Sequence, residues 1–128
     1  ELVEMDRIAI ADPDLAPAGE YAREALDNIG VWSSISKKTV LSSDVRTALA
    51  YVQTGDVGAA VVYRTDVPIA AGVSTKLLIP REHHTRIVYP AAVVKNAREP
   101  MLGKEYLEFL RASYVTSVFE KYGFVSVR

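Results

Sequence analysis

The sequence predicts an α/β fold with a mainly parallel sheet, because short apolar runs alternate with amphipathic stretches at helical spacing. The apolar runs at residues 8–11, 39–41 and 57–63 are typical of strands. The stretches at 21–29 and 45–52, which separate them, are typical of helices. Such short connections from strand to helix to strand favour right-handed crossovers and parallel neighbours.

Local signals bound the first strand and the first helix. The apolar run at 8–11 ends at Asp12-Pro13, and a loop over 13–19 leads into the helix. The apolar stripe of that helix is formed by Tyr21, Ala22, Ala25, Leu26 and Ile29. Gly30 is expected to end the helix, since glycine adopts the left-handed conformation that commonly follows a last helical turn.

The second helix has a clear start. The Ser-Ser-Asp sequence at 42–44 supplies residues that cap a helix N-terminus, and Gly55 marks the helix end. Its apolar stripe is formed by Val45, Ala48, Leu49 and Val52. The run at 57–63 is almost wholly apolar, so we expect this third strand to be buried on both faces.

The remainder of the chain predicts two more strands and then helices. Residues 76–79 and 87–89 are apolar enough for strands, and the pattern becomes helical from Pro100 onward. The apolar positions of these helices are Leu102, Tyr106, Leu107, Phe109, Leu110, Val118, Phe119 and Tyr122. No repeat or second linker interrupts the sequence, which predicts a single α/β domain over 1–128.

Composition excludes several classes of function. Hydrophobic residues make up 49% and charged residues 24% of the 128 positions, which is typical of a globular domain. A formal net charge of −1 does not provide the basic surface that nucleic-acid binding requires. No apolar run approaches the roughly 20 residues that cross a bilayer. The absence of cysteine removes disulfides, thiolate nucleophiles and cysteine-based zinc sites.

Three segments are expected to meet beyond the carboxyl ends of the strands, where open α/β sheets bind ligands. They are Pro17-Ala18-Gly19, Asp44-Val45-Arg46 and Val62-Tyr63-Arg64. Two helix N-termini and a phenol form a set of neutral donors, which suits a small, fully ionised oxyanion. Each segment also has a plain structural interpretation: helix punctuation, a helix cap, and a tyrosine at the edge of the core.

Catalytic signals are weaker, and we predict that the chain is not an enzyme. His83-His84 lies in a charged loop without a supporting metal-ligand motif, which favours solvated surface. Asp12 and Asp14 follow the first strand as acidic residues do in phosphoacceptor receiver domains, but the rest of such a site has no counterpart here. Nucleophile-elbow, dinucleotide-binding and phosphate-loop motifs are all absent.

The ordered motifs of the chain resemble those of the periplasmic molybdate-binding proteins. The matching segments are 7–13, 16–22, 24–26, 44–49, 52–55, 61–66, 88–93 and 119–124. They occur in the family's order along essentially the whole chain. The resemblance implies a three-layer αβα lobe of a type II periplasmic binding protein, which delivers molybdate, and usually tungstate, to the membrane permease of an ABC transporter.

The resemblance also implies the ligand contacts. The family uses the backbone N–H of the alanine in Pro-Ala-Gly, the backbone N–H of the valine in Asp-Val-Arg, and a tyrosine hydroxyl. Carried over by motif, these are Ala18, Val45 and Tyr63. Molybdenum would be bound only as molybdate, and no cofactor is implied. The family implies a periplasmic or other extracytoplasmic location, with a lipid anchor an option for the full-length protein.

One departure from the family is informative: the lobe that supplies two serine hydroxyls to the same anion has no counterpart in this chain. The chain then resembles the second, C-terminal lobe and holds a half-site. Residues 88–128 would be a return strand and helices that normally pack on the first lobe. We expect them to fold back or to pair with another copy of the chain.

Two other functions remain open. One is a binding protein of the same fold for another oxyanion or small solute. The other is the effector-sensing domain of a transcription regulator, which would require a basic helix-turn-helix segment that these residues lack.

Overall fold

The computed structural model describes residues 2–126. The chain divides into two compact units, Glu1–Arg86 and Ile87–Arg128. The first contains the whole sheet and the second contains two helices. The boundary lies next to residue 88, where the return segment was expected to begin. That residues 1–128 act as one lobe stays a prediction.

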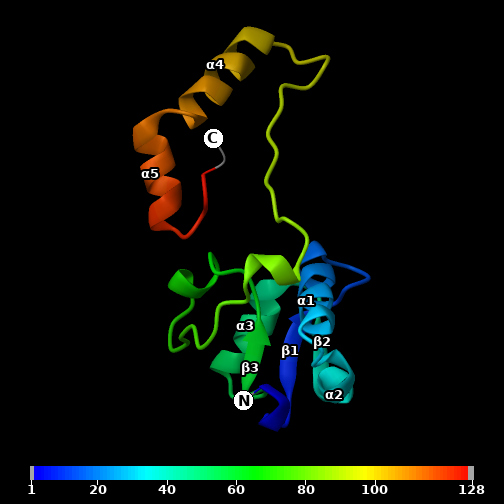
Figure 1. The fold of residues 1–128 in the computed structure, drawn as a ribbon. Helices are drawn as coiled ribbons and strands as arrows, with labels where there is room; N and C mark the ends of the chain where they lie inside the picture. Colours follow the sequence, from blue (N-terminus) through cyan, green and yellow to red (C-terminus); the bar gives the residue numbers. More distant parts are fainter. Residues whose placement is uncertain (1, 127–128) are drawn as a thin grey trace. The chain divides into compact units, whose positions relative to one another are not determined.

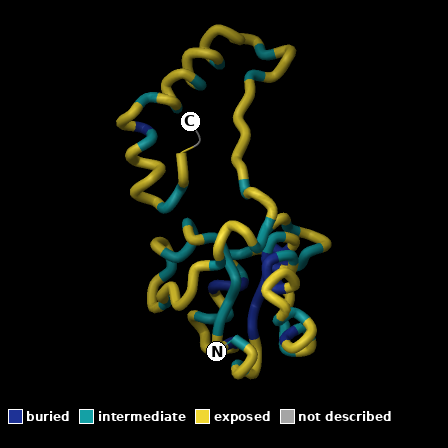
Figure 2. The backbone as a smooth tube through the Cα atoms, in the orientation of Figure 1, coloured by how far each residue is buried: buried dark blue, intermediate teal, exposed yellow. Residues whose placement is uncertain are grey.

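The first unit is built on a three-stranded parallel sheet (Figure 1). Its strands are β1 (Ile8–Ala11), β2 (Thr39–Ser42) and β3 (Ala59–Val61), in the order β2-β1-β3. β1 pairs in parallel with both neighbours. All four residues of β1 are fully buried, as Figure 2 shows. The predicted α/β class and parallel sheet are therefore confirmed.

Helices cover both faces of the sheet and make three layers (Figure 1). Helices α1 (Pro17–Asn28) and α2 (Trp32–Ile35) lie on one face, and α3 (Val45–Gln53) lies on the other. The layers follow from the pleat of β1, because successive side chains of a strand point to opposite faces.

Each face of β1 has its own apolar cluster. Ile8 packs with Leu26 and Ile35 from the α1 and α2 side. Ala9 packs with Ala48 of α3 and with Val57. Neighbouring residues of β1 therefore pack against different helices, Ile8 against α1 and α2 and Ala9 against α3.

The two predicted helix ends are confirmed. Gly30 follows α1 with φ of 81°, and Gly55 follows α3 with φ of 79°. Positive φ values of this size are readily adopted by glycine and strained for other residues. Within residues 2–126, four 3₁₀ turns complete the secondary structure: η1 (Leu2–Glu4), η2 (Ser36–Lys38), η3 (Val67–Ile69) and η4 (Arg81–His83).

The prediction of a long third strand buried on both faces was wrong. β3 spans only Ala59–Val61, and its three residues are half-buried. β3 lies at an edge of the described sheet, so no strand protects its outer side. Of the predicted run, Val57 is buried, and it lies before the strand begins.

The predicted strands at 76–79 and 87–89 were also wrong, since the structure has extended or irregular backbone there. Leu77, Leu78 and Val88 are exposed by 69%, 55% and 53%. An apolar run forms a strand only where a neighbouring strand offers hydrogen bonds. In the described part of the chain, residues 76–79 and 87–89 pair with neither edge strand, β2 or β3, so no ladder forms there.

The second unit contains α4 (Pro100–Leu110) and α5 (Ser113–Lys121), which confirms the helical pattern predicted from Pro100 onward. Only Val115 is buried among the described residues of these helices. Their large apolar side chains are mostly exposed (Figure 2): Met101, Leu102, Tyr106, Phe109, Tyr114, Val118 and Phe119. Among residues 2–126, no helix has the length and apolar character of a membrane span.

Candidate oxyanion-binding site

The three predicted ligand donors all follow strands of the sheet. Ala18 lies in the first turn of α1, which follows β1, and Val45 is the first residue of α3, which follows β2. Tyr63 comes two residues after the end of β3. Because the strands are parallel neighbours, their carboxyl ends share one edge of the sheet. Residues that are far apart in sequence are thereby brought to the same edge.

The first turn of α1 leaves the N–H group of Ala18 available. Pro17 has no N–H, and Ala16 provides no side-chain cap. The N–H groups of Gly19 and Glu20 donate to the Ala16 carbonyl at 2.9 and 3.4 Å. In the described chain, no hydrogen bond uses the Ala18 N–H. The helix dipole adds positive potential at this donor.

A turn at Asp12 places α1 directly after β1. The Asp12 carbonyl accepts from the N–H groups of Leu15 and Ala16 at 3.0 and 2.9 Å, and its Oδ1 accepts from the Asp14 N–H at 2.9 Å. Asp12 therefore stabilises the turn. Within the described chain, no group of three or more acidic, histidine or cysteine residues could hold a metal ion.

Gly19 is buried where α1 meets the end of β1. A Cβ added at Gly19 would lie 2.2 Å from the Ala11 carbonyl oxygen and 2.6 Å from the Asp12 carbonyl carbon. Both atoms belong to the backbone, so they cannot move aside as a flexible side chain would. Only glycine lets the helix begin this close to the sheet, and the helix start carries the Ala18 donor.

The first turn of α3 is capped by Asp44. Its Oδ1 accepts from the N–H groups of Arg46 and Thr47, each at 2.9 Å, and its Oδ2 accepts from the Ser43 hydroxyl at 2.9 Å. These hydrogen bonds, led by the one from the Thr47 N–H, hold the pKa of Asp44 below its ordinary value. The Val45 N–H has no partner in the described hydrogen bonds, so it remains available to a ligand.

Ser42 fixes the position of this helix start against β1. Its hydroxyl lies 3.1 Å from the Ile10 carbonyl oxygen and 2.9 Å from the Asp44 carbonyl oxygen. Ser42 is buried, and its hydroxyl and that of Ser43 are both used within the fold. The Ser-Ser-Asp sequence thus acts as a cap for α3.

Tyr63 is half-buried, and its backbone is held by Asp66. The Asp66 N–H donates to the Tyr63 carbonyl at 3.0 Å, and the Tyr63 N–H donates to the Asp66 carboxyl group. Burial raises the pKa of Asp66, while the hydrogen bond from Tyr63 and the charge of Arg46 oppose that rise. Sequence reasoning did not single out Asp66, although it lies three residues after Tyr63 in the same motif.

The His83-His84 loop has a structural role. The His83 carbonyl accepts from the Asn28 side chain at 2.9 Å. Glu24 of α1 accepts from both the N–H and the hydroxyl of Thr85, each at 2.8 Å. These bonds, led by the one from the Thr85 N–H, lower the pKa of Glu24. The loop is therefore docked on α1 by specific hydrogen bonds.

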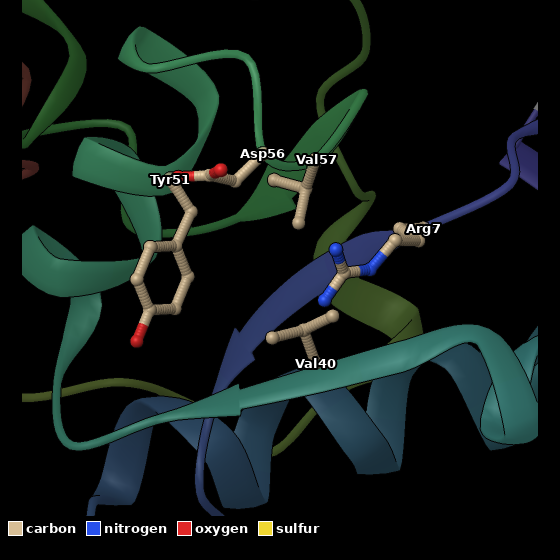
Figure 3. Close-up of a pocket in the computed structure, with 5 residues that line it drawn as sticks. All are labelled: Arg7, Val40, Tyr51, Asp56 and Val57. Atoms are coloured by element: carbon tan, nitrogen blue, oxygen red, sulfur yellow. The ribbon is translucent and has the colours of Figure 1, made fainter.

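A shallow cavity of about 210 Å³ lies at the opposite edge of the sheet. Its lining residues are Arg7, Val40, Tyr51, Asp56 and Val57 (Figure 3). Arg7 directly precedes β1, and Val57 precedes β3, which places the cavity towards the amino ends of these strands. Ala18, Val45 and Tyr63 do not line it.

A parallel α/β lobe with helix starts beyond the carboxyl ends of its strands is typical of proteins that bind small ligands. The chain belongs to the family of bacterial extracellular solute-binding proteins, whose model matches residues 2–125. This family consists of solute-binding transport proteins.

Individual relatives narrow the comparison. YvgL of Bacillus subtilis, described as an ABC transporter substrate-binding lipoprotein, is 38% identical over 98% of this chain. The molybdate-binding protein ModA of Escherichia coli is 35% identical over 92% of it. The chain covers 48% and 46% of these two relatives, so it spans about half of their length.

A solved structure shows the same fold. It is described as the substrate-binding domain of a molybdenum ABC transporter from Clostridium difficile, and it superposes with a TM-score of 0.87 at 29% identity. The match covers 99% of this chain and 56% of the other. The predicted periplasmic-binding-protein fold is therefore confirmed for this chain.

Gly19→Ala is expected to destabilise the first unit by about 1–3 kcal/mol, because the added methyl group must displace backbone at the end of β1. Thermal unfolding measures the effect. Gly58→Ala is the matched control, since its nearest neighbour would be the Met5 sulfur at 3.7 Å. A Gly19→Ala protein as stable as the parent would show that the helix start is not held tightly against β1.

Asp44→Ala is expected to lower stability at neutral pH by removing the cap of α3. The pKa of Asp44 is depressed on folding, so its contribution is present above its ordinary value of 3.8 and is lost as pH falls through the lower folded value. Urea unfolding across this range should show the parent and variant converging in acid. A stability difference between parent and Asp44→Ala that stays the same in acid would contradict the role of the ionised cap. Asp6→Ala, at an exposed position, is the control.

Proposed function

We propose that this chain forms one half of the oxyanion site of a molybdate-binding protein in an ABC uptake system. The observation that carries the proposal is the arrangement of the donors: two helix N-termini and a tyrosine follow three parallel strands at one edge of the sheet. The proposed donors are the backbone N–H groups of Ala18 and Val45 and the hydroxyl of Tyr63. The name of ModA supports molybdate as the ligand, and tungstate would bind in the same way.

The proposed mechanism has three steps. The oxyanion first sheds water at the carboxyl edge of the sheet. It then accepts hydrogen bonds from the Ala18 N–H, the Val45 N–H and the Tyr63 O–H. Closure of a second lobe finally encloses the anion. Hydrogen bonds to charged groups stabilise by about 1.5–3 kcal/mol each, so a lobe with half of the donors should bind several orders of magnitude more weakly than the complete site.

Neutral donors also set the selectivity of such a site. A fully ionised anion accepts every hydrogen bond that they offer. A protonated anion such as hydrogen phosphate brings a donor of its own, and neither backbone N–H can accept it. Discrimination between molybdate and the smaller sulfate would then depend on the size of the closed cavity.

The second unit supports the proposed two-lobed architecture. Its helices expose many large apolar side chains, which globular proteins normally bury against a partner. We propose that residues 88–128 pack on the missing lobe in the whole protein, with another copy of the chain as the alternative partner. The whole protein would act outside the cytoplasm and deliver its ligand to the membrane permease, and a lipid anchor would agree with the name of YvgL.

Other functions receive less support. A binding protein for a different oxyanion would use the same donors, and comparing thermal shifts with molybdate, tungstate, sulfate and phosphate distinguishes it. An effector-sensing regulator shares the lobe architecture, but the relatives named above are described as binding proteins.

Tyr63→Phe is expected to weaken molybdate binding by about tenfold or more, because it deletes one hydrogen bond to a charged ligand. Calorimetric titration of a chain extended by the missing lobe measures the change. Tyr51→Phe removes the same hydroxyl at the opposite edge of the sheet and should leave the affinity unchanged. Equal affinities for the parent and Tyr63→Phe would remove Tyr63 from the site.

A further inference from the structure

Asp66 has an unusual environment beside the proposed site. Its Oδ2 is buried and has no hydrogen-bond partner, the one side-chain atom of this kind identified within residues 2–126. Burial raises the pKa of this carboxyl group. Buried polar atoms are nearly always hydrogen-bonded, so an unpartnered carboxyl oxygen in this position indicates a specific role.

The hydrogen bonds of Asp66 point back towards Tyr63. Its N–H donates to the Tyr63 carbonyl at 3.0 Å, and its carboxyl group accepts from the Tyr63 N–H. Asp66 also precedes the 3₁₀ turn η3, yet its side chain makes no capping hydrogen bond to that turn. Both backbone polar groups of Tyr63 are therefore held by one residue.

Asp66 also interacts with the start of α3. The positive charge of Arg46 acts on the Asp66 carboxyl group. Arg46 is the second residue of α3 and follows Val45 directly, and its own N–H is bound by the Asp44 cap. The Asp66 carboxyl group, in the segment that follows β3, is therefore within electrostatic reach of the helix turn that carries the Val45 donor.

We propose that Asp66 is a positioning residue, which holds Tyr63 in register with the first turn of α3 so that the Tyr63 hydroxyl and the Val45 N–H converge on one anion. The inference rests on the proposed function. A negative charge beside an anion site weakens affinity by repulsion, so positioning is the contribution by which Asp66 would favour binding. Preorganised donors bind more tightly because less conformational freedom is lost on binding.

Two substitutions distinguish the positioning role of Asp66 from the effect of its negative charge. Asp66→Asn keeps an oxygen that accepts from the Tyr63 N–H and removes the charge, whereas Asp66→Ala removes both. In amide hydrogen exchange, the Tyr63 N–H should exchange faster in Asp66→Ala and close to the parent rate in Asp66→Asn. Unchanged exchange at Ile10 in the buried strand β1 verifies that each variant is folded. Parent-like protection of Tyr63 in Asp66→Ala would overturn the proposal.

Binding provides the second test, read from the shift of the Val45 amide resonance at one fixed molybdate concentration. We expect the response to fall about tenfold in Asp66→Ala, as it does in Tyr63→Phe, and to be equal to the parent or larger in Asp66→Asn. The double variant Tyr63→Phe with Asp66→Ala should be no weaker than Tyr63→Phe alone, because Asp66 acts through Tyr63. Additive losses, or a parent-like Asp66→Ala, would overturn the proposal.

The two tests fail differently. If molybdate leaves the Val45 amide of the parent protein unchanged, the proposed function is wrong. The exchange rates still decide whether Asp66 positions Tyr63.

Discussion

The parallel pairing of β1 with both β2 and β3 is the constraint on which the proposed site depends. Each strand contributes little by itself, since the longest has four residues. Their common direction nevertheless places three carboxyl ends at one edge. β1 lies in the middle with its four residues fully buried, so it anchors the helix starts and the tyrosine against a rigid element.

Both backbone donors are made available by the way their helices begin. At α1, a proline removes one N–H, and Gly19 allows the helix to start against the backbone of β1. At α3, the Asp44 side chain binds the second and third N–H groups and leaves the first. Different local chemistry therefore produces the same result: one backbone N–H per helix start without a partner in the described chain.

The elements that local signals specify were predicted well from the sequence. Gly30 and Gly55 end helices where expected, and Ser-Ser-Asp caps α3. The strands predicted at 76–79 and 87–89 are not formed. A strand requires a hydrogen-bonding partner, which an apolar pattern does not reveal. The same limit explains the shortened β3, which lies at an edge of the described sheet.

The candidate donors could be named from strand ends and motifs, but the residues that support them could not. The role of Gly19 depends on its approach to Ala11 and Asp12, and that of Asp66 depends on burial and on the charge of Arg46. Such contacts exist only once the chain has folded. An Asp three residues after a Tyr carries no signal of either burial or a missing partner.

The most direct test of the half-site account is an amide resonance titration of this chain with molybdate, using sulfate as the control. A half-site should bind molybdate weakly, with the largest shift changes at the Ala18 and Val45 amides and smaller changes around the Arg7 and Tyr51 cavity. Changes centred on that cavity, or no response at either helix start, would contradict the assignment of the site. Tight and selective binding by this chain alone would contradict the claim that a second lobe supplies the remaining donors.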